Sequence, residues 1–132
     1  ALLRIVTNVD VFSPVKIGDS NAVQRGDAIV VIGNPDGGRF AHSVLSGIVS
    51  GANRELGLLQ LSVTTYGGIS GAPVFNNIGE VIGVMVSVPQ TKIDTKMTVG
   101  NETINVPMVS QMNEFGFAIP INHAKGLLQL TH

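Results

Sequence analysis

The sequence lacks cysteine and tryptophan entirely, and it has few charged or aromatic residues. The absence of cysteine excludes disulfide bonds and thiolate metal sites. Charged residues make up 13% of the 132 positions, whereas an average domain has about 25%. The eight lysines and arginines are scattered along the chain, and only 5% of residues are aromatic. We therefore expect no nucleic-acid partner.

Long apolar runs are also missing. The longest uninterrupted apolar stretch covers a few residues, whereas a membrane-spanning helix needs roughly 20, so no membrane span is predicted. Hydrophobic residues nevertheless make up 44% of the chain. This composition predicts an apolar outer face that meets a protein partner or drives self-association of the isolated chain.

Short runs rich in valine and isoleucine dominate what is present. With turn sequences between them, they predict strands at 1–6, 28–32, 44–49, 58–63, 80–88 and 115–119. This spacing is typical of an all-β antiparallel barrel or sandwich in a single domain, and the missing strand–helix–strand alternation argues against a parallel α/β fold. One short helix is predicted at the C-terminal end, where Asn122 can cap it. Residues 89–114 are predicted to insert an extra hairpin that turns near Gly100 and Asn101.

Glycines surround Ser70 in the stretch TTYGGISGAPVFNNIGEV, which covers residues 64–81. A serine hydroxyl is a weak nucleophile unless a base takes its proton and donors stabilise the oxyanion that forms. Backbone N–H groups are good donors, and aiming two of them at one point requires backbone angles that glycine tolerates. The N–H groups of Gly68 and Ser70 could converge in this way. Taken alone, the stretch fits either a nucleophile loop or a tight turn without chemistry.

The same stretch resembles the nucleophile region of chymotrypsin-like serine proteases, most of all the HtrA/Deg branch. Three further segments resemble that branch in the same order: VKIGDSNAVQRGDAIVVIGNPDG, SVLSGIVSGANRE and FGFAIPINHAKGLL. The resemblance covers most of the chain apart from residues 89–114. It implies a trypsin-like serine protease fold, in which residues 1–132 form the second antiparallel β-barrel with a short C-terminal helix.

The resemblance also implies roles for individual residues. Ser70 corresponds to the catalytic nucleophile, and the N–H groups of Gly68 and Ser70 correspond to the oxyanion hole. Two neighbours depart from the family pattern. Ile69 stands where asparagine or aspartate is common, so it has no polar group to brace the loop, and Ala72 replaces the usual second glycine. No metal or other cofactor is implied.

Substrate-binding positions follow from the resemblance in the same way. They comprise the wall and floor of the primary specificity pocket, the strand that pairs with the substrate backbone, and the strand behind the pocket: Thr64 and Thr65; Val86, Ser87 and Val88; and Gly116. Because no acidic residue falls at the pocket floor, a small or medium apolar substrate side chain is expected there. The implied substrate is a peptide or an unfolded protein, and the implied location is the periplasm, the cell envelope or outside the cell.

The chain does not contain a complete catalytic triad in the family order of His, Asp and Ser. His42 is the only histidine before Ser70, and no aspartate lies between them. The opening residues ALLRI resemble the end of the family segment D-L-A-L-L-K-I, whose Asp is catalytic. We therefore expect the catalytic His and Asp upstream of Ala1, in an N-terminal barrel that would be a partner of this one, and we expect the chain alone to be inactive.

Two other interpretations use the same residues. The order Ser70, Asp94, His123 matches that of α/β-hydrolases, but the chain is too short for that fold and has Ala72 where their elbow needs glycine. His42 and His123 fit ordinary surface positions better than catalytic bases. The remaining alternative is a pseudoprotease or peptide-binding module that keeps the fold without catalysis.

Overall fold

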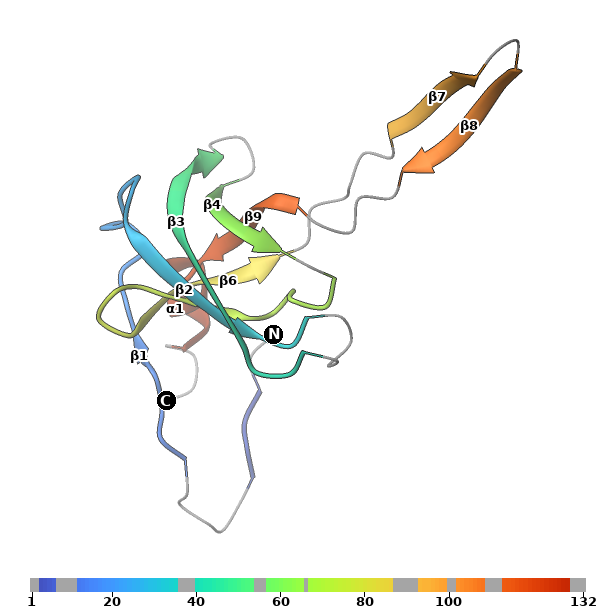
Figure 1. Ribbon diagram of the computed structural model, residues 1–132. Helices are drawn as coiled ribbons and strands as arrows, with labels where there is room; N and C mark the ends of the chain where they lie inside the picture. The colour runs from blue at the N-terminus through green and yellow to red at the C-terminus, as the bar shows by residue number, and fades with distance from the viewer. Residues whose placement is uncertain are drawn as a thin grey trace.

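The computed structural model describes residues 3–6, 12–35, 40–53, 57–65, 67–86, 93–99, 102–108 and 113–128. Its elements are β1 (Lys16–Ile17), β2 (Ala28–Gly33), β3 (Ser43–Asn53), β4 (Leu58–Thr65), β5 (Pro73–Phe75), β6 (Glu80–Val86), β7 (Ile93–Val99), β8 (Glu102–Met108), β9 (Asn113–Pro120) and α1 (Asn122–Leu128). Within these residues, β6, β5, β2, β3, β4 and β9 pair in that order, and β9 pairs back to β6 (Figure 1). The predicted antiparallel barrel is confirmed, and β1 is added to it in parallel with β6.

Alternation of side chains builds the core of the barrel. Along β4, Leu59, Leu61 and Val63 are buried, whereas Ser62 and Thr64 between and beyond them are exposed. Because successive residues of a strand point to opposite faces, this pattern sends one face into the barrel. The other strands and the loop before β5 complete one cluster with these residues: Ile29, Val31, Val49, Ile69, Ala72, Val74, Ile82, Met85 and Ala118. Each fully buried Val, Leu or Ile stabilises the fold by about 1.5–3 kcal/mol relative to an exposed one.

The strand predicted at residues 1–6 is wrong for the part that the structure describes. Residues 3–6 form no strand, and Leu3 and Val6 are 86% and 92% exposed. An apolar run becomes a strand only when a neighbour takes up its backbone hydrogen bonds, and no described strand of the chain pairs with these residues. No sequence pattern predicts β1. Both of its residues are exposed, and they form a strand because they pair with Glu80 and Val81.

A hairpin lies between β6 and β9, within the segment 89–114 where the sequence predicts an insertion. Strands β7 and β8 pair antiparallel over their whole length, from Ile93 opposite Met108 to Val99 opposite Glu102. They form a two-stranded sheet of their own, which projects from the barrel in Figure 1. The predicted turn residues Gly100 and Asn101 lie outside the described residues, as do Ser87 and Val88 beyond the end of β6.

The outer face of the barrel is apolar across neighbouring strands. Ile32 on β2 lies opposite Val44 on β3, and both are exposed. Farther along, Ile48 on β3 and Phe115 on β9 lie on either side of Ser62 on β4, and both are about half exposed. The apolar outer face expected from the composition is therefore present. The described part of the chain holds no helix with the length and hydropathy to cross a membrane.

Candidate active site

Ser70 lies in the loop that connects β4 to β5, and glycines shape this loop. Gly68 has a φ of +91° and Gly71 a φ of +89°, both in the left-handed region that side chains disfavour. Ser70 itself is exposed. The sequence therefore uses glycine at the two positions where the backbone turns on either side of the serine.

Ile69 anchors the loop in the barrel core. Its side chain is only 5% exposed, and it belongs to the core cluster together with Ala72. Both pack against β2, because a Cβ built on Gly33 would lie 3.3 Å from Ile69 Cγ1 and 3.1 Å from the Cβ of Ala72. Ile69 thus holds the loop by apolar packing, where a polar residue would hold it by hydrogen bonds. Because Ile69 points into the core, the next residue, Ser70, points to the surface.

Backbone hydrogen bonds tie the same loop to β6. The N–H of Gly71 donates to the carbonyl of Met85 at 2.9 Å, and the N–H of Met85 donates to the carbonyl of Ala72 at 2.8 Å. A third bond, from the N–H of Ala72 to the carbonyl of Ile69 at 3.1 Å, closes the turn that contains Ser70. Fixed donors and a fixed nucleophile are what oxyanion chemistry requires, since reorganisation at the moment of reaction is costly.

Thr65 and Gly116, two of the predicted substrate-binding residues, are in contact. A Cβ on Gly116 would lie 2.9 Å from Thr65 Cγ2 and 2.9 Å from Met85 Cε. Thr65 is 8% exposed, and its Oγ1 donates to the carbonyl of Phe115 at 3.5 Å. The three residues come from β4, β6 and β9, and all three are buried. Met85 was not among the predicted residues.

The structure describes some of the other predicted substrate-binding residues but not all of them. Thr64 is exposed on the face of β4 opposite to Thr65. Val86 is the last residue of β6, where it is half-buried and lies opposite Phe117 of β9. Ser87 and Val88 lie outside the described residues. The structure therefore brings Thr65 and Gly116 together and places Val86 on the strand next to Gly116.

The two described histidines are both exposed, as expected from the sequence. His42 has a φ of +59°, and its backbone N–H donates to Asn34 Oδ1 at 2.7 Å in the connection before β3. His123 lies in α1. Among the described residues, no group of three or more His, Cys, Asp or Glu side chains is arranged to hold a metal ion.

The model of the trypsin-like peptidase domain family matches residues 1–84 of this sequence, which is more than half of the chain. The chain belongs to the trypsin-like peptidase family. Among curated proteins, this trypsin-like chain is 31% identical to a "Serine protease HtrA-like" of Staphylococcus haemolyticus and 28% identical to one of Staphylococcus aureus. Each alignment covers 98% of this chain but only 20% and 16% of the relatives, so the chain spans a fifth of their length or less.

Solved structures show the same fold. The HtrA-type protease AlgW with a tripeptide superposes on this trypsin-like chain with a TM-score of 0.69 at 23% identity, over 93% of this chain and 37% of AlgW. AlgW with a decapeptide gives a TM-score of 0.63 at 22% identity, over 92% and 34% of the two chains. The barrel is therefore the trypsin-like fold found in HtrA proteases.

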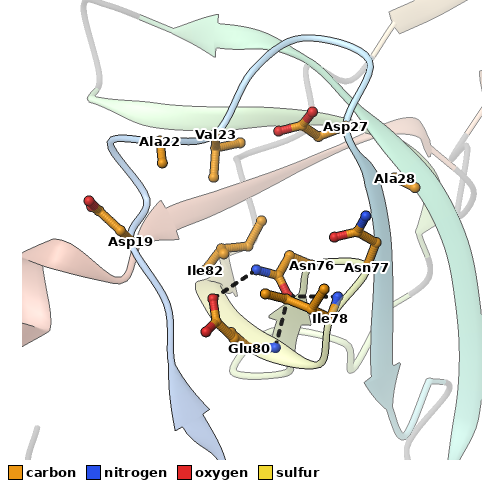
Figure 2. Close-up of a pocket in the computed structure, with 10 residues that line it drawn as sticks. All are labelled: Asp19, Ala22, Val23, Asp27, Ala28, Asn76, Asn77, Ile78, Glu80 and Ile82. Atoms are coloured by element: carbon orange, nitrogen blue, oxygen red, sulfur yellow. Dashed lines mark hydrogen bonds between the residues drawn. The ribbon is translucent and has the colours of Figure 1, made fainter.

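A hollow of about 320 Å³ lies away from the Ser70 loop, at the other end of β5 (Figure 2). Asp19, Asp27 and Glu80 line it together with apolar residues such as Val23 and Ile82. Sequence reasoning missed this hollow, because its carboxylates come from separate turns. In the trypsin-like chain these carboxylates already bind other groups of the protein. The turn that follows β5 binds Glu80.

Asn76 organises that turn. Its Oδ1 accepts the N–H groups of Ile78 at 3.1 Å and Glu80 at 2.8 Å, and its Nδ2 donates to Glu80 Oε2 at 3.1 Å. The other oxygen of Glu80 pairs with Lys16 of β1. Lys16, followed by Asn76, holds the pKa of the Glu80 carboxyl below its usual range. Glu80 therefore fastens β1 to the start of β6.

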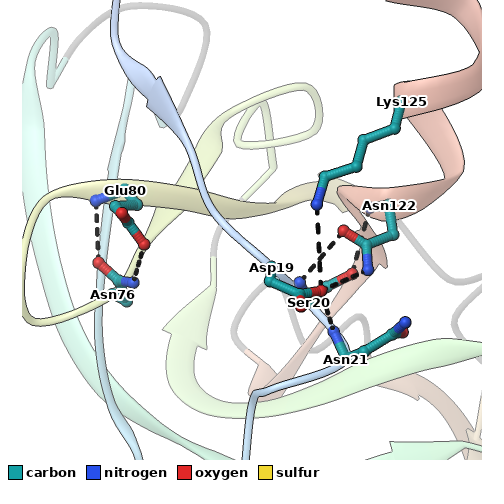
Figure 3. A network of polar contacts seen from close by, with 7 residues as sticks. All are labelled: Asp19, Ser20, Asn21, Asn76, Glu80, Asn122 and Lys125. Atoms are coloured by element: carbon teal, nitrogen blue, oxygen red, sulfur yellow. Dashed lines mark hydrogen bonds and ion pairs between the residues drawn. The ribbon is translucent and has the colours of Figure 1, made fainter.

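A second polar network joins α1 to the loop after β1 (Figure 3). The Asn122 side chain donates to Asp19 Oδ1 at 2.6 Å and accepts the N–H of Ser20 at 3.4 Å, while its backbone N–H donates to Ser20 Oγ at 3.1 Å. Asn21 N–H and the Lys125 ammonium also face the Asp19 carboxylate, at 3.0 Å and 4.0 Å. The hydrogen bond from Asn122, then that from Asn21 and the charge of Lys125, lower the pKa of Asp19.

Acid should therefore weaken the fold. Because the pKa values of Asp19 and Glu80 are lowered in the folded state, their contribution to stability is complete above the unfolded pKa values, about 4. It is lost as the pH falls through the folded values. We expect the urea midpoint to drop between pH 5 and pH 3, and Asp19→Asn and Glu80→Gln each to reduce that drop. An unchanged drop in the double variant would contradict this assignment.

Proposed function

We propose that the chain is the C-terminal barrel of an HtrA-like serine endopeptidase that hydrolyses peptide bonds through an acyl-enzyme on Ser70. The observation that carries the proposal is the loop itself: Gly68 and Gly71 turn the backbone, Ile69 is buried, and Ser70 is exposed. Rigid presentation of one hydroxyl beside glycine N–H groups suits acyl transfer. The family membership of the chain supports the same reaction class.

In this reaction, Ser70 Oγ attacks the carbonyl carbon of the scissile bond while a histidine takes its proton. The N–H groups of Gly68 and Ser70 stabilise the oxyanion of the tetrahedral intermediate. Collapse of the intermediate breaks the C–N bond, and the histidine returns the proton to the leaving amine. Water then attacks the ester on Ser70 with the same histidine as base, which releases the acid and regenerates the hydroxyl.

The histidine and its aspartate would come from an N-terminal barrel outside this chain. The family order of His, Asp and Ser favours this source, because no aspartate lies between His42 and Ser70 and His123 follows Ser70. The exposed apolar outer face, which includes Val44 and Phe115, would provide surface for contacts with that barrel or with further copies of the protein. We accordingly expect the 132-residue chain alone to have no appreciable proteolytic activity.

The proposed substrate is a peptide or an unfolded protein with a small or medium apolar side chain before the scissile bond. Thr65 and Gly116, which touch each other and Met85, would form the floor and back of the pocket, and Thr64 would form its wall. Val86, Ser87 and Val88 would pair with the substrate backbone at the end of β6. The relatives are named as HtrA-like proteases, and a periplasmic, envelope or secreted location is part of the proposal.

A fluorophosphonate–rhodamine probe on the intact protease tests the nucleophile, because it modifies serines that are activated by a base. We expect labelling of Ser70, loss of the label in Ser70→Ala, and full labelling in Ser62→Ala, which changes another exposed serine on β4. An intact, folded protein that stays unlabelled would refute the enzyme. It would favour the alternative of a peptide-binding module without catalysis.

A further inference from the structure

The loop that presents Ser70 has few side chains that can fix its position. A Cβ added at Gly67 or at Gly71 would meet nothing within 4 Å, so the loop borders open space at both positions. Glycine also leaves the backbone freer than any other residue does, and ordering it costs more entropy. Among residues 67–72, only Ile69 and Ala72 are buried. Packing of this part of the loop against the barrel is therefore concentrated in these two side chains.

Both buried side chains lie against Gly33, the last residue of β2. In the pairing of β2 with β5, Val31 lies opposite Val74, and the same register continued by two residues places Gly33 opposite Ala72. A Cβ built on Gly33 would lie 3.1 Å from Ala72 Cβ and 3.3 Å from Ile69 Cγ1. Carbon atoms in favourable contact are about 3.5–4.0 Å apart. The two loop side chains therefore occupy the space that a side chain at Gly33 would need.

Hydrogen bonds connect this apolar contact to the serine. The N–H of Met85 on β6 donates to the carbonyl of Ala72 at 2.8 Å, and the N–H of Ala72 donates to the carbonyl of Ile69 at 3.1 Å. The second of these bonds closes the turn that contains Ser70. Because Ala72 takes part in both bonds and also touches β2, a shift of the contact at Gly33 would move the turn and the hydroxyl that it carries.

We propose that Gly33, Ile69 and Ala72 are positioning residues for Ser70. Ile69 and Ala72 form an apolar plug, and the missing side chain of Gly33 is the socket that admits it. Ile69 and Ala72 are also the two positions at which the loop departs from the family pattern, so the plug gives both departures one purpose. The inference rests on the proposed peptidase function, because a reacting hydroxyl needs accurate placement: a misplacement of about 1 Å can cost about 10²-fold in rate.

Gly33→Ala in the intact protein tests the socket, because the added Cβ must move the plug. We expect the rate constant for labelling of Ser70 by the fluorophosphonate–rhodamine probe to fall at least about tenfold, with an unchanged circular dichroism spectrum. Gly18→Ala is the matched control. A Cβ there would be equally crowded, at 3.1 Å from Ile82 Cγ2 and 3.2 Å from Glu80 Cβ, but its contacts are with the beginning of β6. Its labelling rate should stay within about twofold of that of the unmodified protein.

Ala72→Gly in the Gly33→Ala background should restore labelling. The double variant moves one methyl group across the contact, from the plug to the socket, and so removes the atom nearest to the new Cβ. We expect its labelling rate to return to within about threefold of the unmodified rate, since residues in contact have non-additive effects. A double variant that is labelled no faster than Gly33→Ala would overturn the proposal, as would equal rates in Gly33→Ala and Gly18→Ala.

Ile69→Val keeps the test decisive if alanine at Gly33 prevents folding. This change removes one methyl group from the plug. Ile29→Val removes the same group from a similarly buried core residue at the other end of β2, opposite Gly47. The two variants should lose similar stability, but only Ile69→Val should slow labelling, by at least about threefold. Equal labelling rates in these two variants would also overturn the proposal.

Hydrogen exchange separates failure of this inference from failure of the proposed function. The N–H of Gly71 donates to the carbonyl of Met85 at 2.9 Å, so it should exchange slowly. Mass spectrometry of the peptide that covers residues 67–72 should show faster exchange in Gly33→Ala and no change in Gly18→Ala. This exchange pattern in a protein that is never labelled would keep the plug and remove the enzyme. A labelled protein in which the two glycine variants exchange alike would keep the enzyme and remove the plug.

Discussion

Ser70→Ala in the intact protein is expected, on the proposed mechanism, to lower kcat for a peptide substrate by about 10⁶-fold, as loss of the nucleophile does in serine proteases. KM should stay within about threefold, because the proposed pocket around Thr65 and Gly116 does not involve the hydroxyl. Progress curves at saturating substrate, with the fold checked by circular dichroism, measure both quantities.

Ser62→Ala controls for the loss of an exposed hydroxyl, since Ser62 faces outward on β4. Its kcat should equal that of the unmodified protein. Residual activity in Ser70→Ala within a hundredfold of the starting value would mean that another group attacks the substrate, and the assignment of Ser70 as nucleophile would be withdrawn.

Gly47→Ala is expected to have the largest effect on stability. Gly47 lies in the middle of β3, where an added Cβ would collide with the backbone carbonyl oxygen of Ser62 and lie 2.9 Å from Val63 Cβ. Backbone of a neighbouring strand cannot swing aside as the end of a flexible side chain does, so β3 and β4 would have to separate. We expect a loss of about 3 kcal/mol or more in the free energy of unfolding, measured from urea denaturation.

Gly51→Ala is the matched control four residues along the same strand. The nearest atom to a Cβ there is Gln60 Oε1 at 3.5 Å, an ordinary contact. The alanine reduces the entropy of the unfolded chain, so the variant should be neutral or more stable by up to about 1 kcal/mol. Equal stability of the two variants would show that β3 and β4 are not as close at Gly47 as the structure has them.

The barrel could be predicted because its strands carry the pattern locally. Along β4, every second residue is large and apolar, and this alternation alone determines which face is buried. Residues 3–6 carry a similar apolar signal but form no strand, because pairing depends on a neighbour and not on composition. The two residues of β1 show the converse, since their pairing with β6 leaves no signal in their own sequence.

The shape of the loop around Ser70 was predictable to the same degree. Glycine on both sides of Ser70 indicated the turns that the structure has at Gly68 and Gly71. The anchoring role of Ile69 could not be read from the loop, because it depends on the room that Gly33 leaves on a distant strand. The contact of Met85 with the Gly116 position likewise arises only when β6 and β9 meet to close the barrel.

That closure has a consequence for how the protein can change over evolution. Strands β6 and β9 are held together by their own register, from Gly83 opposite Pro120 to Val86 opposite Phe117. The segment between them therefore contributes only the entropy of closing a loop, which rises by about 0.6 kcal/mol for each doubling of length. Extending a short connection into one that carries a hairpin costs little stability. The connection between β6 and β9, which ends next to Thr65, is thus a place where new recognition elements can be added or exchanged while the barrel stays the same.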